Sequence, residues 1–268
     1  DKSFQLHQDI NYFMNPEWSS VGQPDLYDFV SLGESYSTAT PTVFTGSFYG
    51  NNRKIFAMDI DLSTAAPTVE GIGFVRALGA SGKVQDLTFV LPSVRTNSWD
   101  FSNFKNKIGI IAGMSQGSIK NVKVIEGDVE GSFYIGGLVG LNEGQIELGR
   151  FQGRIEGLSH VGGIVGKLHT TGSASLVKTK FQGQVKIDKN VKPSCSLTAH
   201  TTEPTCDTNG GVWISKSVGG IVGSIGGYIN GAPTGCESIP PSRWLSRGAW
   251  CAATTAASSA RRRSISSS

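Results

Sequence analysis

The sequence lacks a long apolar run. No stretch of 18 consecutive apolar residues occurs among its 268 residues, so we expect no membrane-spanning helix. The first ten residues, DKSFQLHQDI, do not have the regions of a signal peptide. If the protein is exported, its signal was removed or lies outside this sequence.

Histidine is scarce, and its positions exclude the zinc-binding helix of a metalloprotease. The four histidines are His7, His160, His169 and His200, and none of them has the His-Glu-x-x-His spacing. From the residues alone we predict no metal, no cofactor and no catalytic residue.

Cysteine is also scarce, with four residues in the chain. Cys195 and Cys206 bracket a polar segment, SLTAHTTEPT. A disulfide between them could contribute about 2–3 kcal/mol and fits an oxidising compartment. Free thiols are an alternative. A metal site with His200 and Asp207 is a weaker one, because the spacing matches no usual zinc pattern.

A basic excess is missing from most of the chain. The net charge is +3, but residues 232–268 hold five arginines and one glutamate, so residues 1–231 carry −1. A nucleic-acid partner would depend on the three arginines at 261–263, and we expect none.

Glycine, by contrast, is abundant: 35 of 268 residues, without the three-residue period of collagen. The phrase IGGLVG at 135–140 recurs 26 residues later as VGGIVG at 161–166 and again at 218–223, with a blurred copy, IGIIAG, at 108–113. Such a period predicts stacked structural repeats. The glycines of the repeat motif are Gly136, Gly137, Gly140, Gly162, Gly163, Gly166, Gly219, Gly220 and Gly223.

Two apolar ladders follow this period. The second one has the pattern apolar-x-Gly-x-apolar and comprises residues 125–129, 151–155 and 181–185. We expect short strands at both ladders, with positive-φ glycines turning the chain between them. The fold class is therefore all-β: a parallel, right-handed β-helix of about seven coils over residues 1–231. The first ladder is Ile55, Val84, Ile119, Ile146, Leu176 and Ile229.

Two other interpretations of these patterns remain weaker. A phosphate-binding glycine loop needs a following helix, and no 3.6-residue period follows any copy of the phrase. A polysaccharide-cleaving β-helix needs opposed carboxylates, which spacing along one strand cannot establish. We interpret the clustered carboxylates as outward, solvated positions beside the inward Ile60 and Val129. They are Asp59 and Asp61, and Glu126, Asp128 and Glu130.

An aromatic cluster lies in an insertion around residues 92–106. We predict that Trp99, Phe101 and Phe104 cover the core, and a binding patch is the alternative.

The repeated phrase resembles the GLUG motif, which has a Gly-Leu-apolar-Gly core. Residues 132–166 fit it well, and 108–131 and 217–230 fit acceptably. GLUG proteins include bacterial haemagglutinin-like adhesins and the non-catalytic region of immunoglobulin A1 proteases. The resemblance implies an exported, surface-associated β-helix over roughly residues 1–231, and says nothing specific about activity.

The repeat stops after residue 231. Residues 232–268 end in Ala, Ser, Thr and Arg runs, which is typical of a disordered low-complexity tail. A shifted reading frame is the sharper hypothesis. Shifted by two bases, the codons for residues 247–258 permit Gly-Gly-Leu-Val, then Cys or Arg, then Ser-Asn-Asp-Gly-Ser-Ile. This is a further copy of the repeat, except that Cys or Arg replaces the last glycine of the phrase.

These observations favour a non-enzymatic structural or adhesive segment of an exported bacterial surface protein, located outside the cell. Its expected partners are a host or neighbouring-cell surface protein or a glycan, and further repeats of the same polypeptide. The alternative is a polysaccharide-binding or polysaccharide-cleaving β-helix.

Overall fold

The computed structural model describes residues 2–12, 41–62, 69–96, 106–169, 174–187, 194–195, 213–214 and 217–226. Strands dominate this described part, which contains no α-helix. Three sheets are parallel throughout. The two short strands β19 (Ser194–Cys195) and β20 (Trp213–Ile214) pair antiparallel with each other.

The largest sheet has eleven strands and forms the broad face of the molecule. Its central path comprises β1 (Ser3–Gln5), β4 (Ser47–Phe56), β7 (Lys83–Val90), β10 (Ser118–Glu130), β13 (Gln145–Glu147) and β17 (Ser175–Val177). The flanking strands are β2 (Ile10–Asn11), β5 (Asp59–Leu62), β8 (Ser93–Thr96), β14 (Arg150–Gly157) and β18 (Lys180–Ile187).

The other two parallel sheets carry the glycine phrase. One has six strands: β3 (Val43–Phe44), β6 (Val75–Leu78), β9 (Ala112–Ser115), β12 (Val139–Asn142), β16 (Val165–His169) and β22 (Val222–Gly226). The other has three: β11 (Phe133–Gly136), β15 (Ser159–Gly162) and β21 (Val218–Gly219). Isolated bridges from Ile72 to Ile108 and from Ile108 to Ile135 extend the latter.

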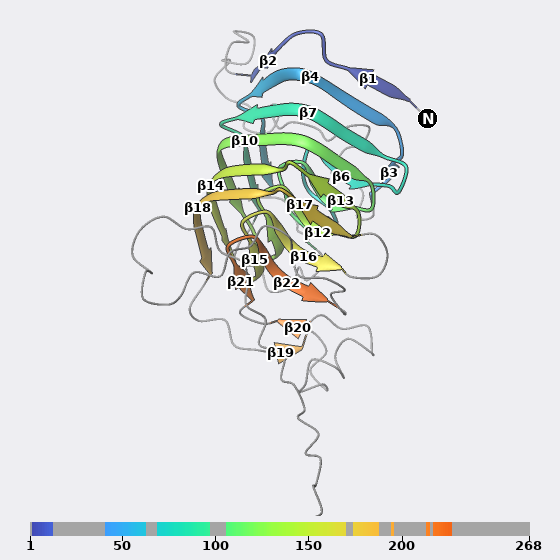
Figure 1. The fold of residues 1–268 in the computed structure, drawn as a ribbon. Helices are drawn as coiled ribbons and strands as arrows, with labels where there is room; N and C mark the ends of the chain where they lie inside the picture. Colours follow the sequence, from blue (N-terminus) through green and yellow to red (C-terminus); the bar gives the residue numbers. More distant parts are fainter. Residues whose placement is uncertain are drawn as a thin grey trace, which may run out of the picture.

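The chain passes through these sheets in turn, so that consecutive repeats of the sequence form adjacent coils. Figure 1 shows β1, β4, β7, β10, β14 and β18 one below another, with the colours changing steadily along the stack. The described residues thus form the predicted parallel β-helix, with six strands stacked along each of the two long sheet paths.

The core of the solenoid is a set of stacked apolar ladders. Val84, Ile119 and Ile146 pair in register and are fully buried, as predicted. Leu176 continues the ladder in a half-buried position, while Ile229 lies outside the described residues. The sequence alignment was wrong at the first rung, because Phe48 is the partner of Val84.

The second ladder also needed one correction. Phe151 stacks on Phe181, as predicted, but Val124 rather than Ile125 is the partner of Phe151. A register shift between Val124 and Gly127 places one extra residue in β10, which is a β-bulge. The pattern search could not detect this insertion.

Most of the corners are formed without glycine, contrary to the prediction. At the bend in the large sheet a column of non-glycine residues has φ between 49° and 58°, the left-handed region. Flanking register pairs place these residues on successive coils. We call them the left-handed column: Asn52, Asp86, Asn121, Leu148 and Lys178.

The phrase glycines have a different role from the predicted one. None of those at 136–166 has a φ in the left-handed range. A Cβ on Gly140 would lie 2.6 Å from the Tyr134 carbonyl oxygen and would overlap the backbone of Ile108. The six-stranded sheet and the chain that enters the three-stranded sheet therefore touch backbone to backbone. Only glycine leaves room for that contact.

The second glycine of the phrase accommodates an aromatic ring. A Cβ on Gly137 would lie 2.5 Å from the ring of Phe151, and one on Gly163 would overlap the ring of Phe181. The two rings stack 6.1 Å apart between successive coils. The glycines of the phrase therefore allow both a close backbone contact and the packing of the second-ladder aromatic rings against the backbone.

Two predictions about chain ends remain predictions. The boundary at residue 231 and the tail 232–268, with its shifted-frame hypothesis, lie outside the described residues.

The described part contains no helix long and apolar enough to cross a membrane.

Candidate functional site

The repeat glycines leave no space for a ligand. At Gly136, Gly140 and Gly166 the atoms that a side chain would meet are backbone atoms, from the same coil or from a neighbouring one. A bound phosphate needs an open loop with its N–H groups pointing outward. The closed packing around these glycines therefore favours a structural role.

The carboxylates singled out in the sequence lie on the outer face of the large sheet. Asp59 and Asp128 occupy one column, with Ser93 between them in register. The residues between the carboxylates along each strand, Ile60 and Val129, are fully buried. Each strand thus alternates outward carboxylate and inward aliphatic residue.

Arginines on neighbouring coils form ion pairs with two of these carboxylates, Asp128 and Asp59. Arg154 donates from Nε and Nη2 to the two oxygens of Asp128, both at 2.9 Å, and from Nη1 to Glu156 at 3.2 Å. The hydrogen bond to Asp128 is the largest of the effects that raise the pKa of Arg154. Arg95 lies 4.0 Å from Asp59. The arrangement matches charge between coils and does not oppose two carboxylates across a cleft.

Among the histidines in the described ranges, His160 has the most strongly altered environment. It is buried at a left-handed corner, where its Nδ1 shares a 2.7 Å hydrogen bond with Ser159 Oγ. Its ring lies 4.8 Å from that of Tyr134, over which Lys167 is placed. Burial, followed by the charge of Lys167, lowers the pKa of His160 to about 3. A neutral, enclosed imidazole with these neighbours packs the corner.

Several predicted residues cannot be compared with the structure. Cys206 lies outside the described residues, and of Cys195 only the backbone, in β19, is described. The aromatic residues at 99–104 also lie outside. Within the described ranges no three His, Cys, Asp or Glu side chains are grouped closely enough to hold a metal ion.

A column of cations, not found from the sequence, runs along the outer face of the large sheet. Register pairs place one of its residues on each of five successive strands from β4 to β18. Four of the five are basic and exposed, and the fifth is a threonine. We call it the cation column: Lys54, Thr88, Lys123, Arg150 and Lys180.

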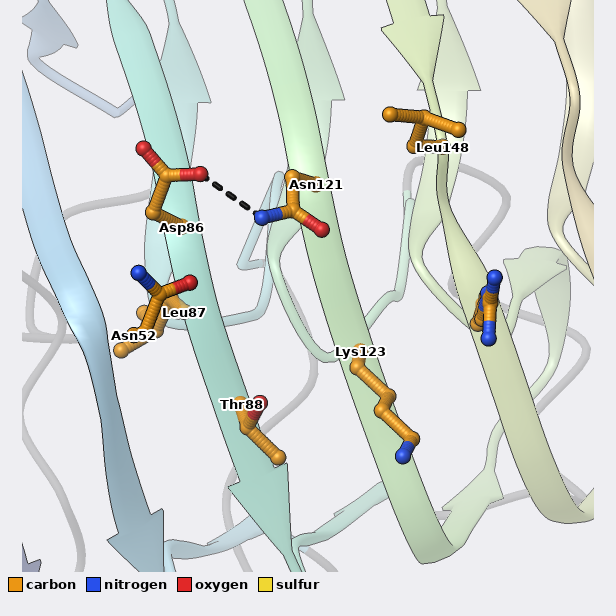
Figure 2. Close-up of a pocket in the computed structure, with 8 residues that line it drawn as sticks. Asn52, Asp86, Leu87, Thr88, Asn121, Lys123 and Leu148 are labelled. Atoms are coloured by element: carbon orange, nitrogen blue, oxygen red, sulfur yellow. Dashed lines mark hydrogen bonds between the residues drawn. The ribbon is translucent and has the colours of Figure 1, made fainter.

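A shallow hollow of about 190 Å³ lies between the cation column and the left-handed column. Figure 2 shows Asp86, Asn121 and Leu148 in one row across the strands, with Thr88 and Lys123 further along their strands. Asn121 Nδ2 donates to Asp86 Oδ1 at 2.7 Å between adjacent coils. The polar lining residues are Asn52, Asp86, Thr88, Asn121, Lys123 and Arg150.

A simple signal could have found the cation column. Each basic member directly precedes an inward apolar residue of the second ladder, as in Lys123-Val124, Arg150-Phe151 and Lys180-Phe181. Because neighbouring residues on a strand point to opposite faces, an inward ladder implies an outward ladder one position earlier. The correct register was needed first, and the bulge in β10 hid it.

Comparison with known proteins gives one partial likeness. Over 140 residues, 52% of its length, the chain is 34% identical to part of Halomucin from Haloquadratum walsbyi. The aligned region is 1% of Halomucin, so this chain spans a very small part of that relative. No family model matches the chain. No solved structure matches it either.

Proposed function

We propose that this chain is a non-enzymatic structural segment of an exported surface protein, with an adhesive lateral face. The observation that carries this proposal is the parallel stacking of one structural unit, with six strands in register along each of the two long sheet paths. Each layer adds length and outer surface at the cost of one short repeat, which suits a spacer that presents side chains along its sides.

Two likenesses support a location at the cell surface. The repeated phrase resembles the GLUG motif of bacterial surface proteins, and the chain is similar over half its length to a small part of Halomucin. Both likenesses are to parts of other proteins. The bacterial origin, the adhesive role and any partner are therefore part of the proposal.

The environment of the outward carboxylates also supports a non-enzymatic role. Asp128 accepts hydrogen bonds from Nε and Nη2 of Arg154, and Asp59 faces Arg95. An inverting or retaining glycosidase needs two carboxylates opposed across the substrate, whereas each of these carboxylates faces an arginine. Carboxylates of this kind suit the stabilisation of neighbouring coils.

Immunolabelling of source cells tests the proposed location. Antibodies raised against the purified chain should label intact cells as strongly as permeabilised ones, and external protease should remove the signal. A cytosolic protein labelled in parallel is the control. Labelling that requires permeabilisation would contradict surface location.

A polysaccharide-binding or polysaccharide-cleaving β-helix is the second candidate, favoured by the polar hollow beside the cation column. Incubation of the purified chain with acidic polysaccharides separates cleavage from binding. Under the first proposal no new reducing ends form, whereas their steady release would establish an enzyme.

A further inference from the structure

We propose that the outer face of the large sheet binds an acidic polysaccharide, whose chain lies along the solenoid axis across β4, β7, β10, β14 and β18. The cation column would contact the carboxylates or sulfates, and the polar hollow would contact ring hydroxyls. This inference deepens the proposed function, because it names a ligand class for the lateral face.

The cations of this column differ from the other charged residues on the same sheet. Lys120 pairs with Glu147 at 3.1 Å and Arg154 pairs with Asp128, each across one coil. Within the described part of the chain, no member of the cation column forms an ion pair with a carboxylate; Lys54 lies 5.9 Å from the ring of Phe56. Like charges stacked on neighbouring strands are destabilising. A column that keeps them unpaired is suited to an external anion.

The geometry of the column is that of a linear ligand. Its five positions lie on successive strands, about 4.8 Å apart and about 19 Å in total. A small anion needs converging donors, but these side chains project in parallel from a nearly flat face. An unbranched polyanion with an acidic group at regular intervals can contact several of them together.

The hollow identifies the polyanion as a saccharide. Asp86 and the amides of Asn52 and Asn121 offer acceptors and donors that match sugar hydroxyls, which both donate and accept. Proteins that bind single-stranded nucleic acid stack bases on aromatic side chains. The lining of this hollow contains none.

Binding of a labelled galacturonate hexamer to the full chain tests the proposal, with single-stranded DNA of equal charge as the competing ligand. The decisive variant is Lys123→Glu/Arg150→Glu, which reverses two neighbouring cations. The matched control is Lys83→Glu/Lys186→Glu. It makes the same change in net charge at exposed positions of the same sheet, outside the column.

We expect the hexamer to bind the wild type and to weaken with added salt. The column variant should bind at least about tenfold more weakly, whereas the control should change binding by about twofold or less. Thermal melts should show both variants folded, since all four side chains are exposed.

Three results would overturn the proposal: no binding of the hexamer by the wild type, equal weakening by both double variants, or binding of DNA as tight as that of the hexamer. None of these results affects the immunolabelling test. Failure of the ligand assignment is therefore distinguishable from failure of the proposed surface location.

Discussion

Two regions of this solenoid both look as if they require glycine, and only one does. At the phrase glycines the backbone of one sheet touches that of another, and a single added carbon overlaps backbone atoms. In the left-handed column the backbone has the φ that glycine favours, yet asparagine, aspartate, leucine and lysine occupy it. Close approach is therefore the stricter constraint.

The two constraints differ in whether their energetic cost can be offset. A left-handed φ costs a non-glycine residue about 1–2 kcal/mol, which neighbouring hydrogen bonds can offset. Leu148, for example, donates its N–H to the Val177 carbonyl at 2.9 Å. A steric overlap with backbone has no such compensation, because the sheet would have to move. The glycine phrase therefore repeats because its backbone contacts another sheet closely, and not because the chain turns there.

The first prediction tests the stricter side of this comparison. Gly140→Ala places a carbon 2.6 Å from the Tyr134 carbonyl oxygen, between two sheets that cannot separate locally. We expect a loss of about 3 kcal/mol or more in the free energy of unfolding, measured by urea denaturation.

The control for that substitution lies in the same coil. Gln145→Ala changes an exposed side chain and should alter stability by about 0.5 kcal/mol or less. Where a glycine is unhindered, replacement by alanine often stabilises by restricting the unfolded chain. A neutral or stabilising result at Gly140 would mean that the backbone contact is not tight.

The second prediction concerns a residue at which both constraints meet. His160 has a φ of 55°, and a Cβ on Gly223 would lie 2.7 Å from its carbonyl carbon. Its pKa is about 3 when folded, against about 6.5 unfolded, so the unfolded chain binds the extra proton between these values. Stability contributed by the neutral ring is present above pH 6.5 and is lost as the pH falls.

Between pH 7 and pH 5 this loss should be about 2 kcal/mol, measured as the change in unfolding free energy. His160→Asn keeps a residue that tolerates the left-handed corner and removes the titration, so its profile should be flatter over this range. His169→Gln is the control, since His169 lies at 3.8 Å from Glu143 in a partly exposed site. A wild-type profile matching that of His160→Asn would contradict burial of a neutral ring.

The sequence was sufficient for the fold because its inward ladders repeat with nearly constant chemistry. Ile119, Ile146 and the paired Phe151 and Phe181 could be aligned from their spacing alone. It failed at the first rung and at β10, where a bulge changes the register by one residue. Such a shift leaves the composition unchanged, so no periodicity search detects it.

The outer face was less predictable for the same reason. The carboxylates were correctly placed outward, but their partners come from other coils, and the cation column exists only in register. Outward residues vary more from rung to rung than inward ones, so their repeat is harder to recognise before the register is known. The column became visible once the inward neighbours Val124 and Phe151 had been paired.

The smallest expected effect sharpens the tolerant side of the comparison. Leu148 holds a φ of 56° that asparagine adopts more readily, and it follows the polar members of the left-handed column. Leu148→Asn should relieve backbone strain. The new amide could also form a hydrogen bond to the neighbouring coil, as Asn121 does to Asp86. The loss of a partly buried leucine opposes this gain. We expect net stabilisation of about 0.5 kcal/mol, measured by chemical denaturation.

Leu148→Ala separates the two contributions to that result. Alanine retains the left-handed strain and loses the apolar contacts, so this variant should be about 1 kcal/mol less stable than the wild type. The difference between the asparagine and alanine variants then measures what an amide gains at a left-handed corner. If the two variants are equally stable, backbone strain at the corner is negligible. The variety of residues in the left-handed column would then mean that the left-handed φ costs little, and not that hydrogen bonds offset its cost.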